Sequence, residues 1–459
     1  MVTIGLVIAQ TAVIHTLLVG PGMPYVTPAA ALDGAARGDT VLVAAGVYHG
    51  ALTVHRPVVL IGEAGATIEG DTRTGTVLTV DADSVVVRGL TVRGSGRALD
   101  HDDAGVKLVR CTGCRVEALR IEQSLHGIYL LESDHAIVRD NIITGTSALP
   151  EAQRGNGIHL FHSTANRLEH NTITGTRDGI YFSFASDNDV AGNTVTGVRY
   201  GLHYMYSDDN RFVGNRFEHN AAGAAVMFSN HITFRENTFA HHVGYRAYGI
   251  LLQTVEEVVA QGNRIEGNLV GVFVDGVVTS TFCGNVIAGN GIGIDLHESD
   301  GNRFAGNTIV DNRVPVRRAR GTGDDAWAVN GRGNYWGDRA VFDLDGDGVG
   351  DRPYHAGDAF ATLSAPRPVL ELFSGTLAAR ALSWAEEALP VFDLSAVRVE
   401  DPAPLMHPPE DAPCAGNSAS SRATIAASAS SASPPSPREE THAHGDAAQA
   451  HSHHTTAQP

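Results

Sequence analysis

A glycine that recurs at intervals of 22 residues constrains the fold of this chain more than any other feature. It precedes a short stretch of alternating side chains, and a few intervals lengthen to 26 or 30 residues. A 22-residue period of β-like segments, with no helical period, is typical of a parallel β-helix. We therefore predict an all-β solenoid of about ten 22-residue coils over residues 15–340. The repeated glycines are Gly75, Gly105, Gly127, Gly157, Gly179, Gly201, Gly223, Gly249, Gly271 and Gly293.

An asparagine follows most of these glycines after fourteen residues. Stacked side-chain amides can bond the backbone groups of a corner, which would otherwise lack partners. Composition agrees, because 51 glycines and 6% aromatic residues favour short strands and tight turns. The asparagines are Asn141, Asn171, Asn193, Asn215, Asn237, Asn263, Asn285 and Asn307.

The two ends of a β-helix need covers, because open coils expose strand edges. Residues 28–43 predict a short helix that leads into the first coil. Residues 361–406 are predicted to form a helical segment, in which Leu377 and Trp384 share one helical face. This face fits either a cap or a docking helix.

The extreme ends differ from the repeats in composition. Residues 1–14 are apolar and lack a basic residue, so they fit a residual signal segment or leader. Residues 13–19 also fit the first strand of the fold. Residues 407–459 are rich in serine, alanine and proline and include five clustered histidines, which predicts a disordered His-rich tail.

Charge and cysteine content narrow the classes of partner and scaffold. The net charge of −18 argues against a nucleic-acid-binding protein, which would present a basic face. Four cysteines are too few for a disulfide-stapled scaffold. Cys111 and Cys114 form a CxxC motif, for which a local disulfide or two inert turn cysteines is the favoured interpretation.

Alternation within the strands places one set of side chains on the outer face. Counting from the repeated glycine, the first and third residues are apolar and fill the interior, so the second and fourth face outward. Met205 and Met227 then occupy the same outward position on neighbouring coils, with His203 two residues from Met205 and His159 two coils away. Thioether and imidazole ligands suit Cu(I). The alternative is an apolar strip buried under a loop or a partner protein.

The longer intervals insert residues at one corner of the coil, so they predict loops that project beside this His/Met face. The loops span 93–105, 144–157 and 239–249. Their expected outer ligands are His101, Asp102, His241 and His242.

An acidic segment near the end of the repeats predicts a calcium-type loop within residues 341–360. Its carboxylates stand at positions 1, 3, 5 and 9, with glycine at position 6, and oxygen ligands at this spacing suit Ca²⁺. Position 12 is Tyr354 instead of an acid, so an acidic turn without an ion is the alternative. The carboxylates are Asp343, Asp345, Asp347 and Asp351.

An enzyme acting on acidic polysaccharides is the competing functional class for a β-helix. Such an enzyme needs carboxylates, a proton carrier and a basic residue in one groove. Asp295, His297 and Glu298 lie on the right face, but we see no lysine or arginine placed between the coils there. We therefore favour a non-enzymatic protein.

Several motifs resemble one known family. RGNGIHL, RDGIYF, RYGLHYMYS, AVMFS and YGILLQ, followed by RGNYWGDRAVFDLDGDGVGDRPY, are similar to NosD-type maturation proteins of nitrous oxide reductase. The resemblance runs from about residue 17 to about residue 406. RYGLHYMYS together with GNYWGD and DGDGVGD makes it specific.

The resemblance implies a right-handed parallel β-helix in the periplasm. It implies an ABC transporter, composed of a membrane dimer and an ATPase, a copper chaperone lipoprotein, and apo nitrous oxide reductase as client. Copper handling on the face of His203, Met205 and Met227, and docking through residues 369–405, follow from it. It assigns no ligands. The weak signal segment and the His-rich tail depart from the family, and the tail is either a weak copper reservoir or incidental.

Overall fold

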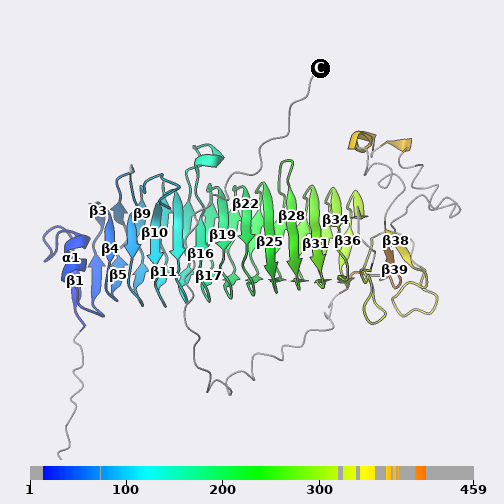
Figure 1. Cartoon of the computed structure of the whole chain (residues 1–459), viewed down its shortest axis with the longest axis horizontal. Helices are drawn as coiled ribbons and strands as arrows, with labels where there is room; N and C mark the ends of the chain where they lie inside the picture. The colour runs from blue at the N-terminus through cyan, green and yellow to red at the C-terminus, as the bar shows by residue number, and fades with distance from the viewer. Residues whose placement is uncertain are drawn as a thin grey trace, which may run out of the picture. The chain divides into compact units, whose positions relative to one another are not determined.

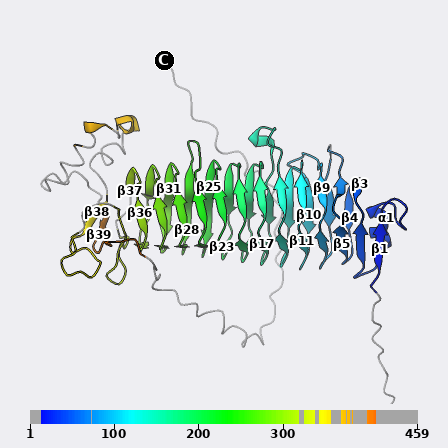
Figure 2. The same cartoon turned by 180° about the vertical axis from the view of Figure 1, so that it is seen from behind.

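The computed structural model describes residues 14–72, 74–318, 324–337, 342–356, 368–373, 376–378, 381 and 399–409. Most of them form coils whose strands lie side by side along a solenoid (Figures 1 and 2). The chain divides into two compact units, Met1–Ala415 and Gly416–Pro459. The second unit lies wholly outside the described residues.

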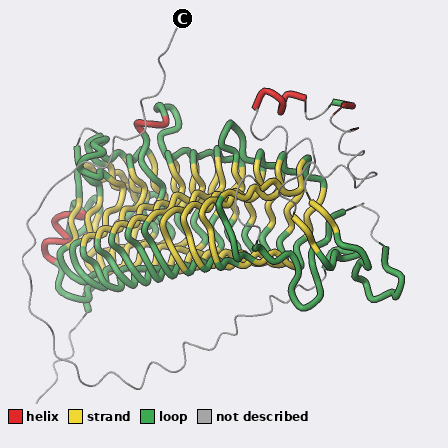
Figure 3. The backbone as a smooth tube through the Cα atoms, turned by 45° about the vertical axis from the view of Figure 1, so that its right-hand side comes forward, coloured by secondary structure: helices red, strands yellow, loops and turns green. Residues whose placement is uncertain are grey.

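Three parallel sheets, named A, B and C, run along the solenoid, and successive coils visit them in the order C, A, B (Figure 3). Sheet A consists of β1 (Thr16–Val19), β2 (Thr40–Val43), β5 (Val59–Gly62), β8 (Val86–Arg88), β11 (Arg115–Glu117), β14 (Ile137–Arg139), β17 (Arg167–Glu169), β20 (Asp189–Ala191), β23 (Arg211–Val213), β26 (Thr233–Arg235), β29 (Val259–Gln261), β32 (Thr281–Cys283) and β35 (Arg303–Ala305). Sheet B consists of β3 (Gly46–His49), β6 (Ala66–Glu69), β9 (Thr91–Arg93), β12 (Arg120–Glu122), β15 (Ile142–Thr144), β18 (Thr172–Thr174), β21 (Thr194–Thr196), β24 (Arg216–Glu218), β27 (Thr238–Ala240), β30 (Arg264–Glu266), β33 (Val286–Ala288) and β36 (Thr308–Val310). Sheet C consists of β4 (Leu52–Val54), β7 (Leu78–Val80), β10 (Ala104–Val109), β13 (His126–Leu131), β16 (Ile158–Phe161), β19 (Asp178–Ser183), β22 (Tyr200–Met205), β25 (Ala222–Asn230), β28 (Tyr248–Glu256), β31 (Val270–Val278), β34 (Ile292–His297) and β37 (Val314–Arg318).

The sequence prediction of a parallel β-helix is confirmed, but the expected number of coils was too low. Sheet A alone contains thirteen strands, compared with about ten predicted coils. The coils before Gly75 escaped the count because they lack the repeated glycine. A further rung follows β35 and β36, where single bridges join Arg303 to Ala326 and Thr308 to Tyr335.

Strand pairing keeps each repeat in register, and this register builds the core. Ile180 pairs with Leu202, which pairs with Ala224, and all three side chains are fully buried. The third residues after the glycines, such as Phe182 and Tyr204, are also fully buried. The first and third residues therefore fill the interior, as alternation predicts for a strand with one face inside the solenoid.

The asparagines form a hydrogen-bonded ladder along one corner. The Asn141 side-chain amide donates to Oδ1 of Asn171 at 2.9 Å and to the carbonyl of Val116 at 2.9 Å. The same pattern continues coil by coil to Asn334, and these side chains are buried. The ladder satisfies buried backbone groups where no strand partner exists, as the repeat predicts.

The N-terminal end matches the sequence interpretation where it is described. Residues 16–19 form β1, the first strand of sheet A. Helix α1 (Pro28–Gly34) then leads to β2, with the Thr27 hydroxyl accepting from the Ala30 amide and a proline in the first turn. Residues 1–13, on which the signal interpretation falls, lie outside the described residues. Among the described residues, no helix has the length and apolar character needed to cross a membrane.

Aromatic stacking and a returning strand cover the last coils. The rings of Phe304, Trp327, Trp336 and Tyr354 stack in series, with centroids 4.6, 5.8 and 4.5 Å apart. Strand β38 (Tyr354–Ala356) pairs antiparallel with β39 (Val399–Asp401). The buried Asp401 carboxylate accepts hydrogen bonds from the Trp336 indole at 2.8 Å and from the Asn334 amide at 2.7 Å.

These residues cover the end that was expected to need a helical cap. Within residues 361–406, the structure describes the short 3-10 helix η2 (Pro368–Phe373), residues 376–378, residue 381 and residues 399–406. Leu377 is 83% exposed. Trp384 lies outside the described residues, so the shared helical face of Leu377 and Trp384 stays a prediction.

Cys111 and Cys114 are joined in a disulfide, which confirms the local pairing favoured for the CxxC motif. Both residues are buried under the turn between β10 and β11. The bridge closes a three-residue separation and holds this turn. It is a structural element of the corner.

Candidate functional site

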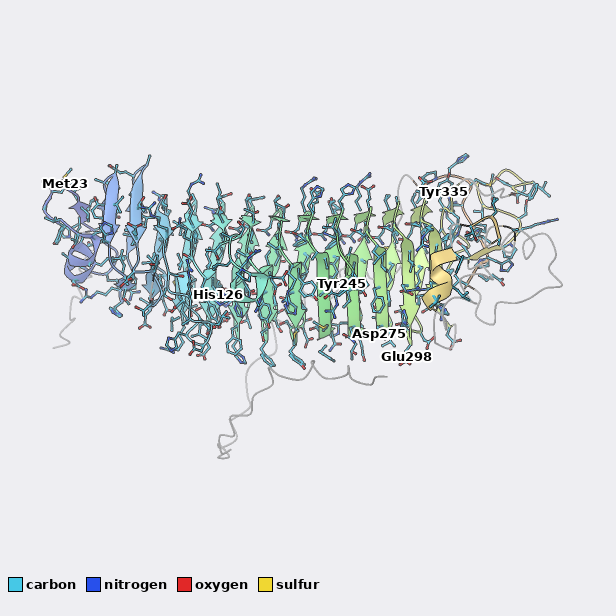
Figure 4. All side chains as sticks on the ribbon, turned by 90° about the horizontal axis from the view of Figure 1, so that it is seen from above. Met23, His126, Tyr245, Asp275, Glu298 and Tyr335 are labelled. Atoms are coloured by element: carbon cyan, nitrogen blue, oxygen red, sulfur yellow. A yellow bond between two sulfur atoms is a disulfide. The ribbon has the colours of Figure 1, made fainter. Side chains whose placement is uncertain are left out.

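The outer face of sheet C carries the residues predicted to be functional. Its strands align Tyr129, His159, Tyr181 and His203 in one column of neighbouring side chains. A second column, two residues further along each strand, contains Met205 and Met227. Figure 4 labels His126 at the start of β13, Tyr245 before β28 and Asp275 in β31, which mark positions along the solenoid.

Met205 and Met227 are direct register partners on β22 and β25. Both side chains are half-buried and face away from the solenoid interior. Neighbouring strands of a sheet lie about 4.8 Å apart, so two flexible thioethers at this position can converge on one ion. The structure thus brings together the methionine pair that alternation predicts.

His203 is held by a buried carboxylate that the sequence prediction missed. Its Nδ1 lies 3.0 Å from Oδ2 of Asp178, and the His203 side chain is 14% exposed. Arg199 binds the same carboxylate through two hydrogen bonds, from Nε to Oδ1 at 2.8 Å and from Nη2 to Oδ2 at 2.7 Å. Because Nδ1 faces an acceptor, the proton of a neutral His203 is placed there and Nε2 keeps its lone pair. Among the described residues, that Nε2 has no hydrogen-bond partner.

Asp178 is fully buried, yet its environment favours the ionised form. Burial alone would raise the pKa of the Asp178 carboxyl. The hydrogen bonds and charges of His203 and Arg199 outweigh burial and hold this pKa well below its usual range. Asp178 was visible in the sequence as the only acidic residue directly before any of the ten repeated glycines. Simple alternation would have placed its side chain inside with Ile180, two residues further on, so its contact with His203 could not be counted from the repeat.

His159 lies in the predicted column but does not meet His203. Its ring packs between Tyr129 and Tyr181, with centroids 4.4 and 4.5 Å away, and Tyr181 separates it from His203. The Nε2 of His159 is buried and has no hydrogen-bond partner among the described residues. Burial, followed by the electrostatic effect of His126, lowers the pKa of His159 well below its usual value. His159 is therefore a neutral imidazole separated from the methionine pair.

His126 is a second buried imidazole on this face. It is 3% exposed, and its Nδ1 accepts a hydrogen bond from the Asn156 amide at 3.1 Å. Burial, with smaller contributions from the charges of Arg177 and Lys107, lowers the pKa of His126 to about 3. The His126 and His159 ring centroids are 5.3 Å apart.

The loops from the longer repeats project as expected, but their histidines have different environments. The loop with the short 3-10 helix η1 (Glu151–Gln153) and the loop before β28 leave the same edge of the solenoid (Figures 1 and 2). His101 is exposed, and its Nε2 lies 3.7 Å from Oδ2 of Asp100. His241 is exposed and stacks on His219, with ring centroids 5.5 Å apart.

His242 departs from the expected outward position. It is 3% exposed and takes an asparagine's place in a corner ladder, where Nδ1 accepts from the Asn220 amide and its own amide donates to Asn268. Burial lowers the pKa of His242 to about 3. The insertion after residue 242 projects, whereas His242 itself still belongs to the repeat.

Asp102 lies near the same face, close to the Tyr129 hydroxyl. Burial, followed by the nearby Asp102 carboxylate, raises the pKa of the Tyr129 hydroxyl. Lys107 lies above the Tyr129 ring, with Nζ 4.8 Å from its centroid.

A second buried carboxylate on sheet C corrects the sequence reading of the IDLHESD segment. Asp295 is 1% exposed and lies 3.1 Å from Nε2 of His297. Arg317, on the next coil, binds both carboxylate oxygens at 2.9 and 2.5 Å. A basic residue is therefore present between the coils, although the sequence reading found none. It was missed because no repeated glycine marks the coil that contains β37.

Three carboxylates of the acidic loop each place a potential ligand atom within 4.8 Å of the others. These carboxylates are Asp343, Asp345 and Asp347. Among the described residues, no other group of three or more His, Cys, Asp or Glu side chains is as close. Asp343 accepts from the amides of Gly346 and Gly348, and Asp351 accepts from the Leu344 amide at 2.5 Å. Desolvation opposes ionisation of Asp343, but these backbone donors lower its pKa.

Comparison with known proteins identifies the family. A family model described as "Periplasmic copper-binding protein (NosD)" matches residues 147–340. The chain is 34% identical to a "Probable ABC transporter binding protein NosD" of Pseudomonas aeruginosa, over 86% of this chain and 95% of that one. It is 32% identical to a protein of the same description from Stutzerimonas stutzeri, over 80% and 86% of the two chains.

Solved structures share the fold at low sequence identity. The A-module of mannuronan C-5 epimerase AlgE6 from Azotobacter vinelandii has a TM-score of 0.53 at 17% identity, covering 67% of this chain and 93% of that one. The pre-mature gene product 12 of bacteriophage phi29 has a TM-score of 0.52 at 13% identity, covering 65% and 48%. These likenesses show the β-helix alone. The relatives in sequence, which match over nearly their whole length, show that this chain belongs to the NosD family.

Proposed function

We propose that this chain is a periplasmic, non-enzymatic accessory protein for the maturation of nitrous oxide reductase. It binds Cu(I), the apo-enzyme or both while the copper-sulfide centre is assembled. The observation that supports copper handling is the pairing of Met205 with Met227 beside a histidine that Asp178 orients. Copper here is cargo that is received and passed on.

The residues of this face suit a soft monovalent ion. Two thioethers and one neutral imidazole favour Cu(I) over harder ions. The Asp178 carboxylate fixes the proton on Nδ1 of His203, so Nε2 is the nitrogen that would bind copper. The half-buried position shields the ligands in part while it leaves one side open for transfer. His159 is left out of this proposed ligand set because Tyr181 separates it from His203.

The proposed partners follow from the family. Relatives are described as ABC transporter binding proteins, which supports an ABC transporter as partner here. We propose that the transporter consists of a membrane dimer and an ATPase. A copper chaperone lipoprotein and apo nitrous oxide reductase are the proposed donor and client. The family description also supports a periplasmic location.

The affinity for Cu(I), measured by competition with a chromophoric chelator, tests the copper proposal. The full chain with its tail histidines replaced by glutamine is compared with the same chain carrying Met205→Ala/Met227→Ala. We expect the double substitution to weaken binding by about 100-fold or more, because two of three soft ligands are lost. Unchanged binding would reject the methionine site. If the chain that keeps both methionines does not bind Cu(I), docking of a partner remains as the role of this face.

A polysaccharide lyase or epimerase is the second candidate, because Asp295, His297 and Arg317 form an acid, imidazole and guanidinium cluster on the outer face. The buried Asp295 carboxylate is already paired with both neighbours. Burial alone would raise its pKa, but the hydrogen bonds and charges of Arg317 and His297 lower it. A carboxylate held in this way serves structure better than proton transfer. Turnover of a uronate polymer that is lost with Asp295→Ala would overturn the non-enzymatic proposal.

A further inference from the structure

Four stacked rings form a ridge along the corner that follows sheet C. His162, Phe184, Tyr206 and Phe228 stand one above another, with centroids 4.9, 5.3 and 5.3 Å apart and ring planes within 12° of parallel. We name these four residues the aromatic ridge. Phe184, Tyr206 and Phe228 are 47%, 46% and 43% exposed. Water therefore covers nearly half of each large apolar ring, which is costly unless a partner replaces it.

The four ridge residues share an unusual backbone conformation. All four ridge residues have positive φ, between 48° and 52°. This left-handed conformation suits glycine or asparagine and is unusual for bulky aromatic residues. Gly276 occupies the same column three coils after Tyr206. Glu132 and Thr254 have φ in the same range at this position of neighbouring coils, so the backbone does not require rings here and four consecutive rings are a feature of the surface.

The ridge is continuous with the methionine pair. Tyr206 directly follows Met205, and Phe228 directly follows Met227. Phe161 joins the two surfaces at the other end, with its ring 4.4 Å from His162 and 6.4 Å from Phe184. A molecule seated on the ridge would therefore touch or closely approach the proposed copper ligands.

The corner that contains the ridge is acidic. Residues 131–136, 161–166, 183–188, 205–210, 227–232 and 253–258 form this corner on six successive coils and contain no lysine or arginine. They contain seven carboxylates: Glu132, Asp134, Asp187, Asp208, Asp209, Glu256 and Glu257. We name these seven residues the acidic border. Only the histidines His135, His162 and His231 can carry positive charge on this corner.

We propose that the aromatic ridge and acidic border form the docking surface for a protein partner with apolar side chains flanked by lysine or arginine. Charge complementarity selects this occupant. A second copy of this chain would set two acidic borders against each other, and an anionic lipid surface would also be repelled. The proposal rests on the proposed function, because it places the copper-exchanging partner directly beside Met205 and Met227.

Binding of purified apo nitrous oxide reductase to the full chain, followed by surface plasmon resonance, tests the surface. The ridge variant is Phe184→Ser/Phe228→Ser, and Val47→Ser/Ile142→Ser is the matched control, since both control residues are exposed on sheet B. We expect the ridge variant to bind at least about tenfold more weakly and the control to match the wild type. Circular dichroism confirms that each variant keeps the β-helix.

A charge variant provides an independent test. Asp187→Lys/Asp209→Lys removes two exposed carboxylates of the acidic border without touching a ring. We expect slower association and a weaker dependence on salt than in the wild type. Sedimentation velocity addresses self-association. A wild-type dimer that the ridge variant loses would identify a second copy as occupant and overturn the proposal.

The outcomes separate docking from the proposed function. Cu(I) affinity should be unchanged in the ridge variant, because no ridge side chain belongs to the proposed ligand set. Ridge-dependent client binding without Cu(I) affinity would support the docking surface and reject copper binding. Client binding that the ridge and charge variants leave intact would reject the docking surface alone. If the wild type binds neither the client nor Cu(I), both the docking surface and the proposed copper function are rejected.

Discussion

Two clusters on sheet C use the same electrostatic arrangement in different surroundings. Asp178 and Asp295 are both buried, and each is bound at both oxygens by an arginine from the next coil and also contacts a histidine. In the first cluster the carboxylate contacts Nδ1 of His203, whereas in the second it contacts Nε2 of His297. The nitrogen left for a ligand therefore differs.

The neighbours of the two clusters differ even more. The first lies beside a methionine pair and the aromatic ridge, while the second lies beside Gln253, Asp275 and Phe273. Soft ligands and an apolar surface accompany only the first cluster. The comparison teaches that an Asp–Arg–His group is a general means of burying a carboxylate on this face. The chemistry of such a group depends on which imidazole nitrogen stays open to a ligand and on which side chains occupy the neighbouring column.

The largest expected effect is an acid response confined to the first region. The pKa of His126 is about 3 in the folded chain and about 6.5 when unfolded, so the unfolded state binds more protons between these values. Stability from neutral His126 is present above pH 6.5 and is lost as pH falls toward 3. The predicted loss is roughly 3 kcal/mol at pH 4.

Hydrogen exchange between pH 7 and pH 4, corrected for intrinsic rates, measures this response region by region. We expect β13 and β16 to lose protection before β34 and β37, because the second cluster has no buried neutral histidine of this kind. His126→Gln should reduce the pH dependence, since glutamine keeps an acceptor for the Asn156 amide but does not titrate, while buried His159 and His242 still contribute. Equal loss in both regions would show that carboxylate protonation controls acid sensitivity.

The next effect concerns the orientation of His203. Asp178→Asn removes the charge that holds the Nδ1 proton, so we expect Cu(I) affinity to fall about 10- to 100-fold. Asp295→Asn is the matched control and should leave Cu(I) affinity unchanged. The ¹⁵N chemical shifts of selectively labelled His203 report its tautomer, which a purely structural role of Asp178 would not change. Equal affinities of the two variants would remove the distinction between the clusters.

Sequence periodicity predicted the solenoid well, because the spacing of glycines and asparagines is itself the geometry of the coil. The register of Met205 with Met227 followed from the same counting. The partners of His203 could not be predicted by this counting, because Asp178 and Arg199 lie outside the two outward columns that contain His203 and Met205. His242 was misjudged because an insertion follows it while its own position stays in the ladder. The lowered histidine pKa values depend on how deeply each ring is buried, which spacing alone cannot give.

The acidic loop supplies hard ligands that contrast with the soft face. Asp343, Asp345, Asp347 and Asp351 surround a loop tied to the C-terminal segment through the Gly350 amide and the Pro404 carbonyl at 2.7 Å. We expect millimolar Ca²⁺ to stabilise the fold by about 1 kcal/mol, as for a weak extracellular-type site. Thermal unfolding with and without Ca²⁺ measures it, and Asp343→Asn/Asp345→Asn should abolish the gain. An unchanged melting temperature in the wild type would favour an acidic turn without an ion.

The smallest expected effect comes from grafting the methionine pair onto the second cluster. Gln253 and Asp275 are register partners, so Gln253→Met/Asp275→Met places two thioethers on neighbouring coils, as Met205 and Met227 are, in the column that also contains His297. We expect Cu(I) affinity, measured with Met205→Ala/Met227→Ala in the background, to rise by less than about threefold. His297 directs Nε2 to Asp295, so the nitrogen that serves in the first cluster is already engaged here. Recovery of tight binding would mean that the thioether pair alone defines the site and that carboxylate orientation of the imidazole is dispensable.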